Sequence, residues 1–167
     1  MDLLVYIDRG GFIAYFLLFL NIIGFTIIIY KAIVLYISKS TLKALALEII
    51  DELKSSNQSS DVANIESKIS TKIQKLEFGL NSIKIIATIS PLLGLLGTVI
   101  GILSAFDAIS IAGLGDPTIF SSGISVALIT TVAGLIVAIP HYIAYNYFIG
   151  FLDNIEIILK EEILKRV

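Results

Sequence analysis

Three threonines in two long apolar segments are the residues of this sequence best placed for chemistry inside a membrane. Thr98 lies in SPLLGLLGTVIGILSAF, while Thr130 and Thr131 lie in GISVALITTVAGLIVAIP, where Ser125 adds a fourth hydroxyl. Such a hydroxyl can line a polar pathway. It can also bond to the helix carbonyl four residues earlier, which hides it in lipid. The spacing alone leaves both interpretations open.

Charged groups are missing from the same segments. Between Lys84 and Asp153 the only acidic residues are Asp107 and Asp116, both near the short link between the two segments. An ion pathway through a membrane normally carries an ionisable group at mid-membrane. If this chain serves proton flow, the titrating carboxylate must therefore come from another chain.

The remaining chemistry-bearing residues exclude several kinds of protein. The sequence has no cysteine and one histidine, His141, so it predicts neither a disulfide nor a metal site, and no cofactor. His141 precedes Tyr142, Tyr145 and Tyr147, a cluster typical of an interfacial aromatic belt, and we expect it to pack there rather than relay protons. The sequence shows no nucleophile–base pair, so it does not predict an enzyme. Its net charge of −2 gives no basic surface for nucleic acid.

Composition predicts the elements that carry these residues. Hydrophobic residues make up 56% of the chain and charged residues only 16%, whereas a soluble domain has about 25% charged residues. Three stretches have the roughly 20 apolar residues that a spanning helix needs. We therefore expect an all-α membrane protein with an outside N-terminus (1–10), a first transmembrane helix (11–37), a cytoplasmic helical hairpin (38–84), a second transmembrane helix (85–107), an outside link (108–119), a third transmembrane helix (120–150) and a cytoplasmic amphipathic tail (151–167).

The positions of the basic residues predict the orientation. Lysines are frequent between Lys31 and Lys84 and again in the tail, but the link between the second and third spans has no lysine or arginine. Cytoplasmic loops carry the excess of basic residues. The N-terminus is therefore predicted outside and the C-terminus inside, and the long apolar first span is predicted to be a mature helix rather than a cleaved signal.

Small residues follow one face of the second and third spans. Glycine lowers helix propensity by about 1 kcal/mol relative to alanine, so several glycines on one face need a reason. Close approach of two helices in lipid supplies one. We expect the two spans to pack as an antiparallel pair, although the same faces could instead line a central passage. The predicted helix-packing residues are Gly94, Gly97, Gly101, Gly123, Ala127, Gly134 and Pro140.

Amphipathic stripes predict how the cytoplasmic segments pack. Leu42, Leu45, Ile49 and Leu53 share one helical face, and a second stripe runs from Val62 to Leu76 after the polar stretch SSNQSSD. The tail repeats the pattern with Leu152, Ile155, Ile158 or Leu159, and Ile163. We expect these faces to bury one another or a neighbouring subunit, with docking of a separate protein as the alternative.

The runs PLLGLLGTVIGI from Pro91 and GISVALITTVAGLIVAIP from Gly123, followed by Tyr145 and Asn146, resemble the MotA/TolQ/ExbB family. The resemblance covers roughly residues 80–150 and is nearest to the ExbB and TolQ branch. It implies a ring-shaped homo-oligomer, a pentamer, in the bacterial inner membrane, with the outside being the periplasm. It also implies an ExbD/TolR-type single-helix partner whose aspartate carries the proton, and coupling to TonB or TolA.

Within this resemblance Thr98 and Thr131 match the family threonines that face the partner aspartate, and Thr130 and Ser125 are further candidates for the pore or proton pathway. One position departs from the family: Val126 stands where many members have a glutamate, and Ser125 is a weak polar substitute. The short chain disfavours a flagellar stator. Alternatives are a TolQ-type subunit of the Tol-Pal envelope system, a passive membrane scaffold that conducts no ions and, least favoured among membrane functions, a substrate transporter.

Overall fold

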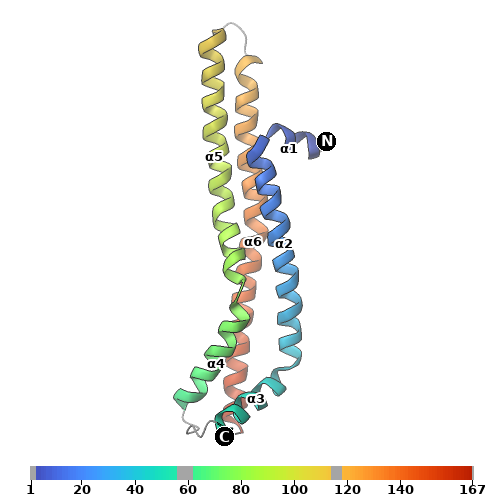
Figure 1. The fold of residues 1–167 in the computed structure, drawn as a ribbon, viewed down its shortest axis with the longest axis vertical. Coiled ribbons are helices and arrows are strands. Elements are labelled where there is room, and N and C mark those ends of the chain that lie inside the picture. The colour runs from blue at the N-terminus through green and yellow to red at the C-terminus, as the bar shows by residue number, and fades with distance from the viewer. Residues whose placement is uncertain (1–2, 56–61, 114–117, 167) are drawn as a thin grey trace. The chain divides into compact units, whose positions relative to one another are not determined.

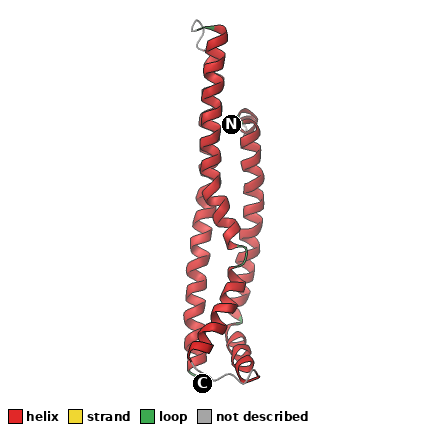
Figure 2. Cartoon of the chain, turned by 60° about the vertical axis from the view of Figure 1, so that its left-hand side comes forward, coloured by secondary structure: helices red, strands yellow, loops and turns green. Residues whose placement is uncertain are grey.

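The structure is a computed structural model that describes residues 3–55, 62–113 and 118–166, and every regular element in this part of the chain is an α-helix (Figures 1 and 2). Among the described residues, three helices are long and apolar enough to cross a membrane: α2, α5 and α6. The prediction of an all-α membrane protein with three spans is confirmed, whereas the ring-shaped assembly stays a prediction. The helices are α1 (Leu3–Arg9), α2 (Gly11–Ser40), α3 (Leu42–Ser55), α4 (Val62–Glu77), α5 (Leu80–Ala112) and α6 (Thr118–Leu164).

Several helices extend beyond the predicted segments, and two of the differences have a local explanation. The N-terminal segment contains the short helix α1, and α2 begins at Gly11, whose φ of 61° suits a residue without Cβ. At the other end, α6 continues through the predicted span–tail boundary to Leu164. Gly150 weakens a helix interior by only about 1 kcal/mol, so the sequence offers nothing strong enough to end the helix there.

Two features named from the sequence fall at least partly outside the described residues. The polar stretch expected to form a turn between the hairpin helices covers Ser55–Asp61, of which only Ser55 is described, at the end of α3. Asp116, one of the two acidic residues near the link, also lies outside the described part of the chain.

The chain divides into two compact units, and each is described by itself. Unit 1 comprises Met1–Thr26 and Ser82–Ile143. Within it α5 and α6 run antiparallel, as Figure 1 shows. A small apolar core joins α2, α5 and α6; it consists of Leu17, Ile86 and Val137, with Ile13, Leu20, Leu93 and Ala133 packed against it.

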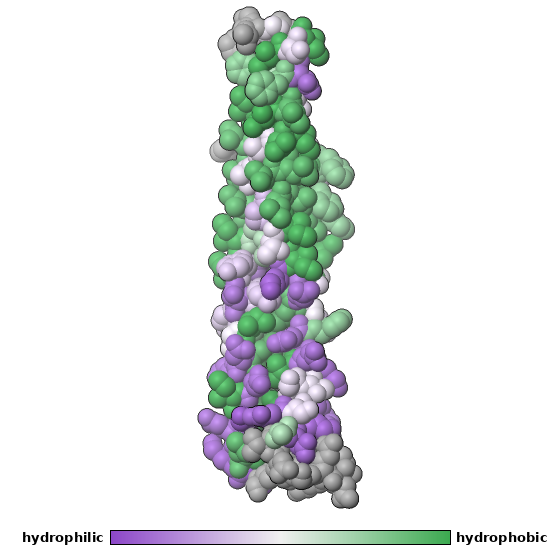
Figure 3. Space-filling view, turned by 90° about the vertical axis from the view of Figure 1, so that its left-hand side faces the viewer, coloured by the Kyte–Doolittle hydropathy of each residue, from purple (hydrophilic) through white to green (hydrophobic). Residues whose placement is uncertain are grey.

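The surface of unit 1 is apolar as well. Leu92 on α5 is 64% exposed, and Leu128 and Ile136 on α6 are 64% and 63% exposed. Figure 3 shows hydrophobic side chains covering much of the viewed face of the chain, with hydrophilic ones gathered over the part that carries α3 and α4. Exposed aliphatic side chains on this scale are unfavourable in water and favourable in lipid, as expected for membrane-spanning helices.

Unit 2 comprises Ile27–Asn81 and Ala144–Val167. Its core is formed by α3, α4 and the end of α6, so the predicted stripes do bury one another within this chain. Of the two candidates in the tail, Leu159 is buried and Ile158 is 38% exposed. The core consists of Ala46, Ile49, Ile50, Ile65, Ile69, Ile73, Ile155, Leu159 and Ile163, with Leu42, Leu45 and Phe151 packed against it.

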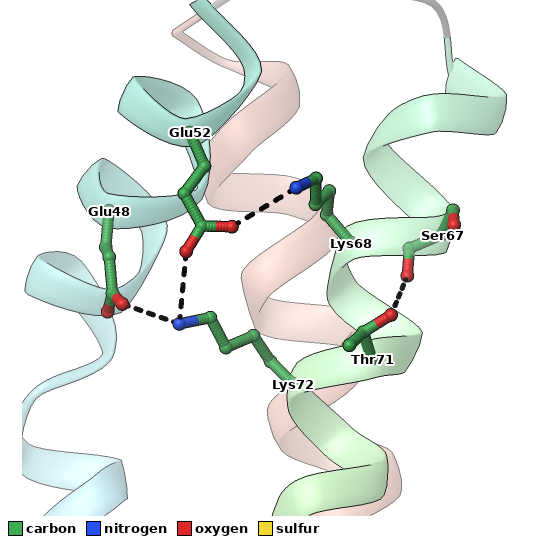
Figure 4. A network of polar contacts seen from close by, with 6 residues as sticks. All are labelled: Glu48, Glu52, Ser67, Lys68, Thr71 and Lys72. Atoms are coloured by element: carbon green, nitrogen blue, oxygen red, sulfur yellow. Dashed lines mark hydrogen bonds and ion pairs between the residues drawn. The ribbon is translucent and has the colours of Figure 1, made fainter. Parts of the chain in front are cut away.

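Ion pairs cross between α3 and α4 (Figure 4). Lys72 lies between Glu48 and Glu52, with Nζ–Oε distances of 2.5 and 3.5 Å, and Lys68 is 3.4 Å from Glu52. The hydrogen bond from Lys68, together with nearby Lys72, holds the pKa of Glu52 below its usual value. The hydrogen bond to Glu48 raises the pKa of Lys72.

A buried lysine ties α2 to the end of α4. Lys31 is 5% exposed, and its Nζ donates to the carbonyl of Leu76 at 3.0 Å. The last carbonyls of a helix lack partners in the helix and attract positive charge. Gly79, with φ of 89°, lets the chain turn beside the lysine stem before α5 begins. Lys31 can therefore lie within the largely apolar helix α2 because its charged group caps the end of α4.

Candidate functional site

The small residues of α5 and α6 face each other within this one chain. A Cβ added to Gly101 would lie 2.6 Å from the carbonyl oxygen of Gly123, and one added to Gly123 would lie 2.5 Å from that of Gly101. One added to Gly134 would lie 2.6 Å from the carbonyl oxygen of Ser90. These neighbours are backbone atoms, which cannot move aside as a side chain can. The two helices therefore approach to a separation that side chains at these positions would prevent.

Gly94 and Gly97 make room for the threonines. A Cβ on Gly94 would lie 2.8 Å from the carbonyl oxygen of Thr130, and one on Gly97 would lie 2.4 Å from its hydroxyl. Ala127 lies in the same contact and is 3% exposed. Of the predicted packing residues, Pro140 is the one outside this contact, half-buried in α6.

Thr98 and Thr131 form a hydrogen-bonded pair across the two helices. Thr98 also lies 3.0 Å from the carbonyl oxygen of Ala127 on α6 and 3.2 Å from that of Gly94 on its own helix. One hydroxyl donates one proton. Thr98 lies nearer to the Ala127 carbonyl than to the Gly94 carbonyl, so Thr98 can donate to Ala127 while Thr131 donates to Thr98. Both threonines remain partly exposed.

Thr130 behaves differently from its neighbour. It is fully buried, and its hydroxyl donates within α6 to the carbonyl of Val126 at 3.0 Å or of Ala127 at 3.1 Å. This is the back-bonding that the sequence left open for all three threonines. Thr98 and Thr131 engage groups on the opposite helix, although Thr98 also lies within bonding distance of Gly94 on its own helix. The structure thus separates one cross-helix pair from one packing threonine.

Ser125 and Val126 lie on α6 one to two turns before Thr131, and both are half-exposed. Val126 brings no ionisable group to this helix face. A cavity of about 320 Å³ opens next to Thr98, and its other lining residues are apolar, among them Phe106 and Phe120. Threonine and serine hydroxyls can orient and hydrogen-bond a proton carrier but do not titrate themselves. The site can therefore assist proton movement only with an ionisable group from elsewhere.

The structure draws attention to three residues that the sequence did not single out or that we interpreted differently: Asn21, Gly24 and His141. His141 was expected at an interfacial belt, yet its side chain is fully buried in unit 1. It packs against Gly24 of α2, and Asn21 lies one turn earlier on that helix. Asn21 and Gly24 interrupt a largely apolar run of α2, and an amide or a glycine in such a run is the signal that could have singled out these two positions.

Comparison with known proteins places this arrangement among described families. Residues 32–161 match the family described as the MotA/TolQ/ExbB proton channel family. The match covers most of the chain and includes both threonines of the cross-helix pair.

Individual relatives are similar over shorter stretches. A putative biopolymer transport protein ExbB homolog of Methanothermobacter thermautotrophicus is 45% identical over 76 residues, 46% of this chain and 26% of that protein. The biopolymer transport protein ExbB of Aquifex aeolicus is 39% identical over 92 residues, 55% and 62% of the two chains. The Tol-Pal system protein TolQ of Haemophilus influenzae is 43% identical over 75 residues, which are 45% of this chain and 33% of that protein. The chain thus covers less than two thirds of each of these relatives.

Proposed function

Because the chain belongs to the MotA/TolQ/ExbB proton channel family, we propose that it is the channel-scaffold, stator-type subunit of an inner-membrane energy-transducing complex. In this proposal an ExbD/TolR-type single-helix partner supplies the proton-carrying aspartate, and proton flow energises TonB-dependent uptake at the outer membrane. A TolQ-type role in the Tol-Pal system, acting through TolA, uses the same chemistry with different partners. The names of the relatives include both branches.

The observation that carries the proposal is the partly exposed hydroxyl pair Thr98–Thr131. It lies on two membrane helices that hold no acidic residue between Lys84 and Asp107, and none between Asp116 and Asp153. A buried carboxylate from a partner helix would find hydroxyl donors at this pair, which stabilise its charged form. The pair would accept the aspartate in either protonation state, since a hydroxyl both donates and accepts.

The assembled form of the proposal is a pentamer in the lipid bilayer around the partner helices. The N-terminus is periplasmic and the C-terminus cytoplasmic, an orientation that rests on the lysines of the long loop and tail. The exposed aliphatic side chains of α2, α5 and α6 offer surface for neighbouring subunits and for lipid.

Thr131→Val tests the function because it keeps the volume nearly constant and removes the hydroxyl. Thr130→Val is the matched control: the neighbouring threonine loses a bond that stays within its own helix. In the complex isolated with its own partners and reconstituted in vesicles, we expect Thr131→Val to assemble normally and to lose most proton-coupled activity. Thr130→Val should keep most of it.

A passive membrane scaffold is the second candidate, favoured by the close glycine contact between α5 and α6. Because such a scaffold conducts no ions, it predicts no proton-coupled activity in the reconstituted complex, and no difference between the wild type and Thr131→Val. Native mass spectrometry of the complex adds an independent test. A pentamer with copies of a small single-helix protein carrying a membrane aspartate supports the motor, and that partner's sequence assigns the ExbB or TolQ branch. A homo-oligomer without such a partner supports the scaffold.

A further inference from the structure

The hydroxyl proton of Thr98 is committed to a backbone carbonyl. Its Oγ1 lies 3.0 Å from the carbonyl oxygen of Ala127 and 3.2 Å from that of Gly94, and a carbonyl oxygen only accepts. Thr131 has one carbonyl within reach, that of Gly94 at 3.5 Å. This distance is outside the range of about 2.5–3.0 Å for O–H···O bonds. In the cross-helix bond Thr131 is therefore the donor and Thr98 the acceptor.

The cavity of about 320 Å³ between α5 and α6 shows where this hydroxyl points. Thr98 lines the cavity, yet the cavity surface is wholly apolar. Thr98 therefore contributes carbon atoms to that surface, while its hydroxyl is turned toward the Ala127 carbonyl and Thr131. A group that enters the cavity meets the carbon atoms of Thr98 and not its hydroxyl.

Thr131 keeps the unused hydrogen-bonding capacity of the pair. It is partly exposed, and within the described part of the chain no group other than Thr98 bonds to its hydroxyl at an ordinary distance. As the donor to Thr98, its oxygen still has lone pairs that can accept. A hydroxyl also rotates, so its proton can leave Thr98 for a stronger acceptor. Thr131 can thus accept from a newly arriving group or, after turning, donate to it.

Resting on the proposed function, in which a partner helix brings an aspartate into the membrane, we infer that Thr131 contacts that carboxyl group and that Thr98 is a positioning residue. A protonated carboxyl donates to Thr131, which keeps its bond to Thr98. For a carboxylate, the Thr131 hydroxyl turns from Thr98 to the charged oxygen. Thr98 therefore competes with the carboxylate for one proton and raises the proton affinity of the partner's carboxyl group. The family resemblance gave both threonines the same role, and the contacts separate the two roles.

The ionisable groups of this chain are far from the pair. On α5 the nearest is Asp107, nine residues after Thr98 and so about 13 Å along the helix. On α6 the nearest is His141, ten residues after Thr131 and about 15 Å away along the helix. The part of α2 in unit 1 has Tyr15 as its one ionisable side chain. Hydroxyl groups, rather than charges of this chain, are therefore the polar side chains next to the partner's carboxyl group.

The rate at which dicyclohexylcarbodiimide modifies the partner's membrane aspartate tests the inference, because this apolar reagent reacts with protonated carboxyl groups. The complex is isolated with its own partners and reconstituted in vesicles, and mass spectrometry of the labelled partner peptide against pH gives the proton affinity of the aspartate. Thr98→Val should lower that affinity about 2- to 10-fold, the range for one hydrogen bond between neutral groups. Thr131→Val should raise it, since the carboxylate loses a charge-assisted bond, which is stronger than a neutral one.

Three further variants separate this role from a structural one. Thr98→Ser restores the acceptor and should keep the wild-type proton affinity. Thr130→Val is the matched control and should also leave it unchanged, because this hydroxyl bonds within α6. Thr98→Ala removes the acceptor without a branched side chain to accommodate, so it should give the same fall if Thr98→Val does not assemble. A more apolar site alone would raise the proton affinity, the opposite sign.

The sign of the change in the Thr98 variants decides the outcome. A rise would mean that Thr98 itself donates to the carboxylate, and no change would mean that it does not act on the carboxyl group. Either result overturns this inference and leaves the proposed function standing. A wild-type complex whose partner has no reactive membrane carboxyl group would overturn both.

Discussion

The α5–α6 contact of unit 1 and the three-helix core of unit 2 are held together in opposite ways. At the first, backbone meets backbone because glycines such as Gly101 and Gly123 carry no side chain. At the second, isoleucine and leucine side chains such as Ile69 and Leu159 fill the space between helices. In lipid there is no hydrophobic driving force that brings apolar side chains together, so helix association there depends on close packing. In water, removing those side chains from solvent drives association.

The contrast teaches that the two regions fail for opposite reasons. A region built on close backbone approach fails when atoms are added, and a region built on filled volume fails when atoms are removed. Unit 2 adds ion pairs at its surface, which the described interior of the α5–α6 contact does not use. Substitutions that add or remove atoms at matched positions can therefore break or sharpen the comparison.

Leu159→Ala should have the largest effect on unit 2. Leu159 is 0% exposed in the core of α3, α4 and α6. Removing a buried leucine side chain costs about 2–5 kcal/mol, since transfer energy is lost and a cavity remains. Hydrogen exchange should show faster opening of α3 and α4. Ile157→Ala on the same helix is the control, because Ile157 is 58% exposed and should change stability little; equal effects would contradict a volume-filled core.

Gly123→Ala should destabilise unit 1 through a single added methyl group. The new Cβ meets the carbonyl oxygen of Gly101 at 2.5 Å, so α5 and α6 must separate. Overpacking of this kind costs about 1–3 kcal/mol, against the small gain in helix propensity from alanine. Thermal unfolding of the purified chain in detergent measures the loss. An unchanged melting temperature would mean that the helices are not held at glycine contact.

Gly150→Ala should act in the opposite direction, although it makes the same chemical change in the same helix. Apart from the adjacent backbone of its own helix, no atom of the described residues lies within 4 Å of the position where its Cβ would stand. Alanine then favours the helix by up to about 1 kcal/mol. The same thermal measurement should show a slight rise. A loss as large as that of Gly123→Ala would indicate that a neighbouring subunit packs on Gly150.

Lys72→Gln should have the smallest effect, and the effect should depend on pH and salt. The pKa of Glu52 is held below its usual value, first by its hydrogen bond from Lys68, so its stabilisation is present above the unfolded-state pKa. It is lost as the pH falls through the folded-state value. The pKa of Lys72 is raised, first by Glu48, so its stabilisation is present at neutral pH and lost as the pH rises through its folded-state pKa.

Chemical unfolding of wild type and variant, followed between acidic and alkaline pH at low and high salt, checks this expectation. The difference between the two proteins should be greatest near neutral pH and low salt, since exposed pairs are screened. Lys75→Gln, on the same helix, is the control for loss of charge alone. A difference that persists in high salt would place the network in a less exposed setting.

Much of the fold was predictable because its signals are local in the sequence. Long uncharged stretches identify α2, α5 and α6, and periodic aliphatic residues identify α3 and α4. The tail was predicted as a separate segment, yet α6 continues to Leu164 because neither Asp153 nor Gly150 ends a helix. The candidate site was only partly predictable, since the residue count cannot tell which of two adjacent threonines faces another helix.

The sequence by itself determined the spanning helices and the family. It also determined that the second and third spans hold no acidic residue at mid-membrane. These conclusions follow from the composition of the chain and from the spacing of residues along the sequence. Only the tertiary structure decided that Thr131 bonds across to Thr98 while Thr130 bonds within α6, and that His141 fills the space beside Gly24. Such choices depend on the distance and rotation between helices far apart in the chain, and those are set by the glycine contacts rather than by any local preference.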